Sequence, residues 1–156
     1  MDEPLGPDAV EAYDKYADEL VRFATSLVGP FDADDIAAAA LVRVLRRSAW
    51  REIADLRPYL HRSVINEARG QRRSTDRRLR REIDAARLAG ETVSAFVRVE
   101  VLDAIRRLTI QQRAVVFMTY WLDQSAAEVA ATLHVSLRTV ERELTRARRA
   151  LEVLLR

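Results

Sequence analysis

The 156-residue sequence has no cysteine, only four glycines and four prolines, and an aromatic content of 6%. Without cysteine, disulfides, thiol catalysis and thiolate metal sites are all excluded. No apolar run reaches the roughly eighteen residues that a membrane span needs, and the N-terminus MDEPLGPD is acidic rather than basic. These absences predict a cytoplasmic protein with no membrane insertion and no secretory signal.

Groups that perform covalent chemistry are equally sparse. The sequence has two histidines, no glycine-rich phosphate loop and no cluster of histidines with carboxylates. His61 has no acidic or histidine partner at ligand spacing and is expected at the surface or on the helix predicted at about 58–73. His134 lies in a predicted turn, where we expect it to adopt left-handed backbone geometry. We therefore predict no enzymatic activity, no cofactor and no bound metal.

Charge is distributed unevenly along the chain. Residues 1–66 contain eight basic and twelve acidic side chains, whereas residues 67–156 contain eighteen basic and twelve acidic ones. An acidic first half and a basic second half suggest protein docking by one and nucleic-acid binding by the other. Seven arginines lie between Glu67 and Glu82. They form either a solvated helical face or a tail that follows phosphates.

Hydrophobic residues recur at helical spacing, and no strand-like alternation persists, so an all-α fold is predicted. Helices are expected at about 8–27, 33–47 and 58–73, with Gly29-Pro30 ending the first and Pro58 beginning the third. Residues 84–97 lose this periodicity and indicate a linker. The predicted organisation is a first helical module at 1–83, a linker at 84–98 and a second helical module at 99–156.

The most specific motif is the stretch SAAEVAATLHVSLRTVERELTRARRAL, from Ser125 to Leu151. Its spacing is that of a helix-turn-helix, because Ser125 and Glu128 form a capping box and Ser136 begins a second helix. The inner face of the second helix is predicted to contain Val140, Leu144, Ala147 and Leu151. Its outer face contains Arg138, Glu141, Arg142, Thr145, Arg146 and Arg149. A helical hairpin without DNA-binding function would share the apolar stripe, but the caps and arginines favour insertion into a major groove.

Three longer segments show a resemblance to a known family. The run AIRRLTIQQRAVVFMTYWLDQSAAEVAATLHVSLRTVERELTRARRALEVL resembles region 4 of bacterial RNA polymerase sigma factors. AYDKYADELVRFATSLVGPFDADDIAAAALVRVLRR and LRPYLHRSVINEARGQRR resemble region 2. The resemblance covers roughly residues 8–73 and 100–153. It leaves no room for the domains between these regions in larger sigma factors, which indicates the extracytoplasmic-function class.

The resemblance implies partners and residue roles. Docking on the clamp helices of core RNA polymerase would involve Asp34, Asp35, Ile36, Ala39 and Arg43. Contacts with the melted −10 promoter element would involve Trp50, Tyr59, Asn66, Arg69, Arg72 and Arg73. Trp50 and Tyr59 are equally well explained as core residues. The outer face of the helix-turn-helix would contact the −35 element. An anti-sigma protein wedged between the two modules is a further partner that this class implies.

Two departures from the family pattern keep alternative functions open. The acidic step before Ile36 is followed by Ala37–Ala40, where the family usually has polar residues that contact polymerase. Glu141 and Glu143 are expected to oppose phosphates. The main hypothesis is a promoter-specificity subunit that initiates transcription. The alternatives are a sigma-derived helix-turn-helix regulator that does not support initiation, and a protein-interaction adaptor that uses the first module.

Overall fold

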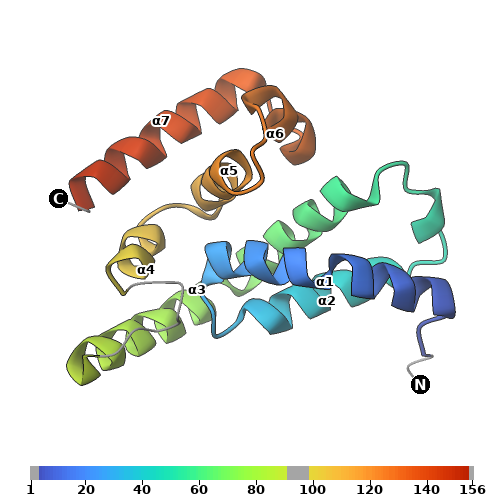
Figure 1. Ribbon diagram of the computed structural model, residues 1–156, viewed down its shortest axis with the longest axis horizontal. Coiled ribbons are helices and arrows are strands. Elements are labelled where there is room, and N and C mark those ends of the chain that lie inside the picture. Colours follow the sequence, from blue (N-terminus) through green and yellow to red (C-terminus); the bar gives the residue numbers. More distant parts are fainter. Residues whose placement is uncertain (1–3, 91–98, 155–156) are drawn as a thin grey trace.

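The computed structural model describes residues 4–90 and 99–154, and all regular structure within those ranges is helical, as predicted (Figure 1). The elements are α1 (Pro7–Val28), α2 (Ala33–Leu45), the 3-10 turn η1 (Trp50–Glu52), α3 (Leu56–Ala89), α4 (Val99–Arg106), α5 (Ile110–Tyr120), α6 (Ala126–Leu133) and α7 (Leu137–Leu154). Helices α1, α2 and α3 pack together, and α5 and α6 pack against this group. Figure 1 shows α7 on the far side of α5 and α6 from α1.

The turn between α1 and α2 contains a glycine whose backbone conformation and close packing disfavour a side chain. Gly29 has φ +85°, and a Cβ atom there would lie 2.7 Å from Cδ1 of Leu79 on α3. A substitution would strain the backbone and force the Leu79 side chain to move. Asp32 in the same turn forms a 3.0 Å ion pair with Arg78, the neighbour of Leu79. The turn is thus attached to α3 well beyond residue 73.

Helix α3 is much longer than the sequence predicted. It begins at Leu56, so Pro58 is its third residue, and it continues to Ala89 before Gly90 ends it with φ +67°. Residues 84–89, predicted as linker, are therefore helical, while residues 91–98 lie outside the described residues. The extension is stabilised by tertiary contacts: Leu79 and Ile83 are buried, and Arg87 pairs with Asp103 of α4 at 3.0 Å.

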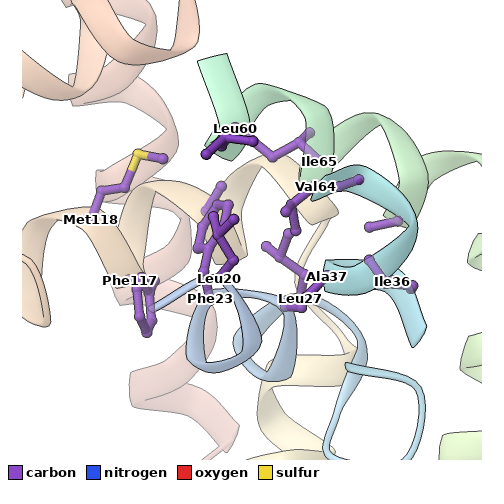
Figure 2. Packing of buried hydrophobic residues seen from close by; sticks show 14 of the residues in the cluster. Leu20, Phe23, Leu27, Ile36, Ala37, Leu60, Val64, Ile65, Phe117 and Met118 are labelled. Carbon is purple, nitrogen blue, oxygen red and sulfur yellow. The ribbon is translucent and has the colours of Figure 1, made fainter. Parts of the chain in front are cut away.

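The two predicted modules share one hydrophobic core. Phe117 and Met118 of α5 are buried in the same cluster as Leu20 and Phe23 of α1 (Figure 2). The ring centroids of Phe23 and Phe117 lie 5.4 Å apart, a normal aromatic contact. The second module is therefore packed directly on the first in this conformation. The sequence suggested two units joined only by a linker, but here the two modules also contact each other through this shared core.

His61 lies on α3, one of its two predicted placements, but its side chain is buried at this core rather than at the surface. The side chain is 2% exposed, and its ring centroid lies 4.8 Å from that of Phe23. Nδ1 donates to the carbonyl of Arg57 at 2.8 Å, and Nε2 lies 3.1 Å from Oε1 of Glu19. The hydrogen bond with His61 holds the pKa of Glu19 at about 2, because burial raises this pKa less than His61 and Arg57 together lower it.

This pKa shift predicts a component of acid sensitivity. The folded pKa of Glu19, about 2, lies below its ordinary value of 4.5, so the charged carboxylate stabilises the fold above pH 4.5. That contribution is lost as the pH falls from 4.5 towards 2. We expect Glu19→Gln to lower stability at pH 6 and to reduce the decline below pH 4.5, measured by urea unfolding. The exposed neighbour change Glu11→Gln is the control, and an identical pH profile for wild type and Glu19→Gln would contradict this expectation.

Candidate nucleic-acid and polymerase interfaces

The helix-turn-helix forms as its capping residues predict. In α6, Ser125 Oγ accepts from the backbone N–H of Glu128 at 3.2 Å, while the Glu128 carboxylate accepts from the Ser125 N–H at 2.6 Å. His134 ends α6 with φ 55° and ψ 43°, which confirms the predicted left-handed turn. The Oγ of Ser136 accepts from the backbone N–H of Thr139 at 3.1 Å and begins α7. These local bonds set the angle at which α7 leaves the turn.

The two faces of α7 separate as the spacing predicts. Val140 and Ala147 are fully buried, and Leu144 lies at the margin of the core, partly buried. The six residues predicted for DNA contact are all exposed: Arg138, Glu141, Arg142, Thr145, Arg146 and Arg149. The hydroxyl of Thr145 donates to the Glu141 carbonyl at 2.9 Å, so its methyl group and both oxygen lone pairs remain available. The exposed face presents four guanidinium groups to solvent.

Glu143 does not lie on that exposed face, contrary to the sequence-based expectation. It is 9% exposed and accepts from Nε2 of Gln112 at 3.1 Å. Its Oε1 lies 3.5 Å from Nε of Arg142 and 3.5 Å from Nη1 of Arg146. This carboxylate therefore orients two arginines from below, while Glu141 alone of the two faces outward. The expectation that Glu143 opposes phosphates is wrong.

The aromatic candidates for −10 contact are packed on arginines at the edge of the core. Trp50 and Tyr59 are both half-buried. Tyr59 accepts a hydrogen bond from Arg47, and the guanidinium of Arg62 lies 5.5 Å from its ring centroid. The guanidinium of Arg51 lies 5.0 Å from a Trp50 ring centroid. Each ring thus combines a packing role with a partly exposed surface, so both explanations remain open.

The remaining −10 candidates lie on the exposed part of α3, and three of them, Asn66, Arg69 and Arg72, border the second module. Asn66, Arg69, Arg72 and Arg73 are all exposed. Asn66 and Arg69 line a cavity of about 160 Å³ between α3 and the α5–α6 region. Arg69 donates to Oε1 of Gln111 at 3.2 Å, and Arg62 donates to the Thr132 carbonyl at 2.8 Å. The sequence did not indicate that Arg62 joins the modules.

The docking candidates on α2 divide into exposed and buried positions. Asp34 and Asp35 are exposed in the first turn of α2, Ala39 is half-buried, and Arg43 is exposed. Ile36 is 0% exposed and packs in the core, so its prediction as a docking residue is wrong. Ile36 lies on the same helix as the exposed docking candidates, but its side chain is on the buried face of that helix. Arg43 forms an ion pair with the carboxylate of Glu67, which is itself almost fully buried.

Within residues 4–90 and 99–154, none of the helices combines the length and the apolar character needed to cross a membrane. The same ranges contain no group of three or more histidine, aspartate or glutamate side chains placed to hold a metal ion.

The first module is helical and has an acidic start to its second helix, and the second module ends in a helix-turn-helix. This combination is typical of transcription factors that bind both RNA polymerase and DNA. Residues 12–78 match the family model for sigma-70 region 2, and residues 98–151 match the model for sigma-70 region 4. The chain belongs to the sigma-70 family. It is an alternative sigma factor, the subunit that binds core RNA polymerase and directs transcription initiation at promoters. The regulator and adaptor hypotheses are not favoured.

Known relatives agree with this assignment. The chain is 35% identical over 136 residues to an RNA polymerase sigma-E factor of Streptomyces antibioticus, a match covering 83% of this chain and 74% of the relative. A sigma-E factor of Streptomyces coelicolor is 32% identical, with 83% and 76% covered. The fold is similar to a chain in the co-crystal structure of the sigma factor RpoE with the anti-sigma factor NepR from Bartonella quintana. The TM-score is 0.65 and the identity 20%, with 96% of this chain and 98% of that chain covered.

Proposed function

We propose that α7 recognises the −35 element in the major groove, and that α3 with the preceding turn binds the melted −10 element. The exposed start of α2 docks on the polymerase clamp helices in this proposal. The observation that supports it best is the phase of α7, whose buried Val140 and Ala147 leave four arginines on the outer face. Arginine clamps guanine edges and phosphates, and Glu141 accepts from a cytosine amino group. Such a subunit performs no covalent chemistry and works in the cytoplasm with RNA polymerase.

Promoter binding as proposed requires the two modules to separate. The −35 and −10 elements are about 25 base pairs apart, or about 85 Å along a duplex with a 3.4 Å rise. A compact chain of this length has a radius of gyration of about 15 Å. The closed arrangement, with Phe117 packed on Phe23, is therefore the form of the chain away from the promoter. Opening exposes the surface of α3 around Asn66 and Arg69.

An anti-sigma protein is a further proposed partner. The similar solved fold is that of a sigma factor crystallised with its anti-sigma factor. We infer that such a partner binds this chain at the surfaces that opening exposes, where it blocks the polymerase and DNA contacts together.

Two arginine variants test the proposed groove assignment. Arg142→Ala is expected to relax sequence preference at the −35 element, because Arg142 lies on the base-facing side of α7 in this proposal. Arg149→Ala is expected to weaken binding to all DNA sequences alike, because Arg149 contacts phosphates in this proposal. Fluorescence anisotropy with matched and mutated −35 duplexes measures both effects. Binding by the wild type should fall steeply between about 50 and 200 mM salt. The assignment would be contradicted if both variants lowered the affinity for every duplex by the same factor. It would also be contradicted if the wild-type affinity did not change with salt concentration.

A further inference from the structure

A basic groove lies between the two modules, and its arginines are ones that the proposed function assigns to promoter DNA. It has a volume of about 510 Å³ and lies between α3, the first turn of α5 and α7. Arg69 and Arg72 line it from α3, and Arg142 and Arg146 line it from α7. Glu143 is the carboxylate among the lining residues, so four cations face one anion. This volume is within the range of about 300–1,000 Å³ typical of small-molecule sites.

The four guanidinium groups are poorly neutralised by the protein. Arg142 and Arg146 share the Glu143 carboxylate at 3.5 Å each, and Arg72 lies 3.6 Å from Asp76. Charge-assisted hydrogen bonds are usually about 2.7–2.9 Å long, so these pairs are loose. Among the described residues, the hydrogen-bond partner of the Arg69 side chain is the neutral amide of Gln111. Several N–H donors therefore remain for an added anion.

The start of α5 adds to the positive potential of the groove. Thr109, Ile110 and Gln111 contribute to its lining. The Thr109 hydroxyl accepts from the Gln112 backbone N–H at 3.1 Å, which leaves the N–H groups of Ile110 and Gln111 without an intrahelical acceptor. The positive end of a helix favours anions, and phosphate groups in particular.

We propose that this groove binds an anion with two or more linked phosphate groups, which bridges α3 and α7. A single phosphate reaches one wall, whereas a linked chain reaches the arginines of both. Glu143 already occupies the α7 arginines, so the ligand must bind them better than a carboxylate does. A terminal phosphate has more charge and more acceptor oxygens than a carboxylate, and the guanidinium fork matches it. Inorganic polyphosphate and nucleoside polyphosphates share this chemistry.

Binding has a consequence for promoter recognition, and this part rests on the proposed function. The groove exists only while α3 and α7 are close together, so an anion that bridges them favours the closed conformation. The anion also occupies Arg142 and Arg146, which are assigned to the −35 element above. Such a ligand therefore inhibits promoter binding in two ways.

Calorimetric titration of the full-length chain with sodium tripolyphosphate tests the site, and two matched pairs of variants locate it. On α3, Arg69 lines the groove and Arg73 does not; on α7, Arg146 lines it and Arg149 does not. All four side chains are exposed, so thermal melts should agree. We expect Arg69→Ala and Arg146→Ala to weaken binding about tenfold or more. Arg73→Ala and Arg149→Ala should change it less than about threefold.

Further titrants identify the chemical class at matched ionic strength. Orthophosphate should bind much more weakly than tripolyphosphate. GTP binding as tightly as tripolyphosphate indicates recognition of the phosphate chain alone, and tighter binding indicates a nucleoside polyphosphate. Equal weakening by all four arginine variants would show diffuse attraction and overturn the proposal. Tighter binding of an oligoglutamate peptide than of tripolyphosphate would overturn it as well.

The conformational consequence is measured with spin labels, which the absence of native cysteine makes site-specific. Ala49→Cys and Ala127→Cys place labels at exposed positions of the two modules. Tripolyphosphate should increase the short-distance population and weaken −35 duplex binding, less so in Arg69→Ala. An unchanged distance distribution on binding would overturn the bridging role. A wild-type chain that binds the −35 duplex normally but does not bind tripolyphosphate would refute this inference and leave the proposed function intact. Normal duplex binding by Arg149→Ala would instead count against the proposed −35 face.

Discussion

Replacing Arg113 with alanine is expected to lower the free energy of unfolding by about 3–5 kcal/mol. The side chain is 2% exposed, and it donates hydrogen bonds to backbone carbonyl groups in both modules. Nε donates to Ile105 at 2.9 Å and to Leu108 at 3.0 Å, while Nη2 donates to Arg106 at 2.6 Å. Nη1 donates to the Leu27 carbonyl at the end of α1. Alanine removes these donors. The Ile105 carbonyl keeps the backbone N–H of Leu108, but each buried acceptor left unpaired costs about 1–3 kcal/mol.

Urea unfolding of Arg113→Ala, compared with a control variant at a nearby arginine, tests this prediction. Arg107→Ala removes an exposed arginine from the turn between α4 and α5, whose ion pair with Asp103 spans 3.8 Å, and should change stability by less than about 1 kcal/mol. Arg113→Lys should recover only part of the loss, because an ammonium cannot reproduce the planar fork of donors. A loss below about 1 kcal/mol for Arg113→Ala would show that water replaces the guanidinium, and the stated role would be wrong.

The second large effect is expected at the polymerase interface. Ala39→Arg should weaken binding to core RNA polymerase by about 100-fold or more, because it adds a long cation between the exposed side chains of Asp35 and Arg43. A pull-down or anisotropy titration with core enzyme measures it. Ala85→Arg introduces the same side chain at an exposed site near the end of α3 and should bind as the wild type does.

The choice of Ala39 follows from the surroundings of its neighbour. Arg43→Glu would also change the surface of α2, but it would place two carboxylates together, since Arg43 pairs with the buried Glu67. Lost folding and lost docking would then be indistinguishable. Binding of −35 duplex by Ala39→Arg should stay normal. If Ala39→Arg bound core enzyme as well as the wild type does, the proposal that α2 forms the docking surface would be wrong.

Local chemistry explains why the second module was predictable. The capping boxes, the left-handed His134 and the phase of α7 depend on residues within four positions of one another. The apolar spacing likewise located the cores of α1, α2 and α5. These features are encoded by short-range patterns, and periodicity detects such patterns well.

Contacts between distant residues explain what the sequence did not reveal. His61 was assigned to the surface because its partner Glu19 lies on another helix, 42 positions earlier. The end of α3 was misplaced because Gly29 and Asp32 hold residues 78 and 79 in a charge-rich segment with little periodicity of its own. The contact from Arg113 to Leu27 spans 86 positions. No residue near Arg113 in the sequence points to an acceptor in α1.

The length of α3 limits how far the opened chain can reach. At 1.5 Å per residue, the helix extends about 35 Å from Asn66 to its end at Ala89. The peptide from Ala89 to Val99 can add at most about 36 Å, whatever its conformation. If α3 and α7 bind the two promoter elements as proposed, the helix and the peptide after it together supply at most about 71 Å of the span, and the second module must supply the rest. In that mode of binding, the covalent dimensions of the chain set an upper limit on the distance between the two promoter elements.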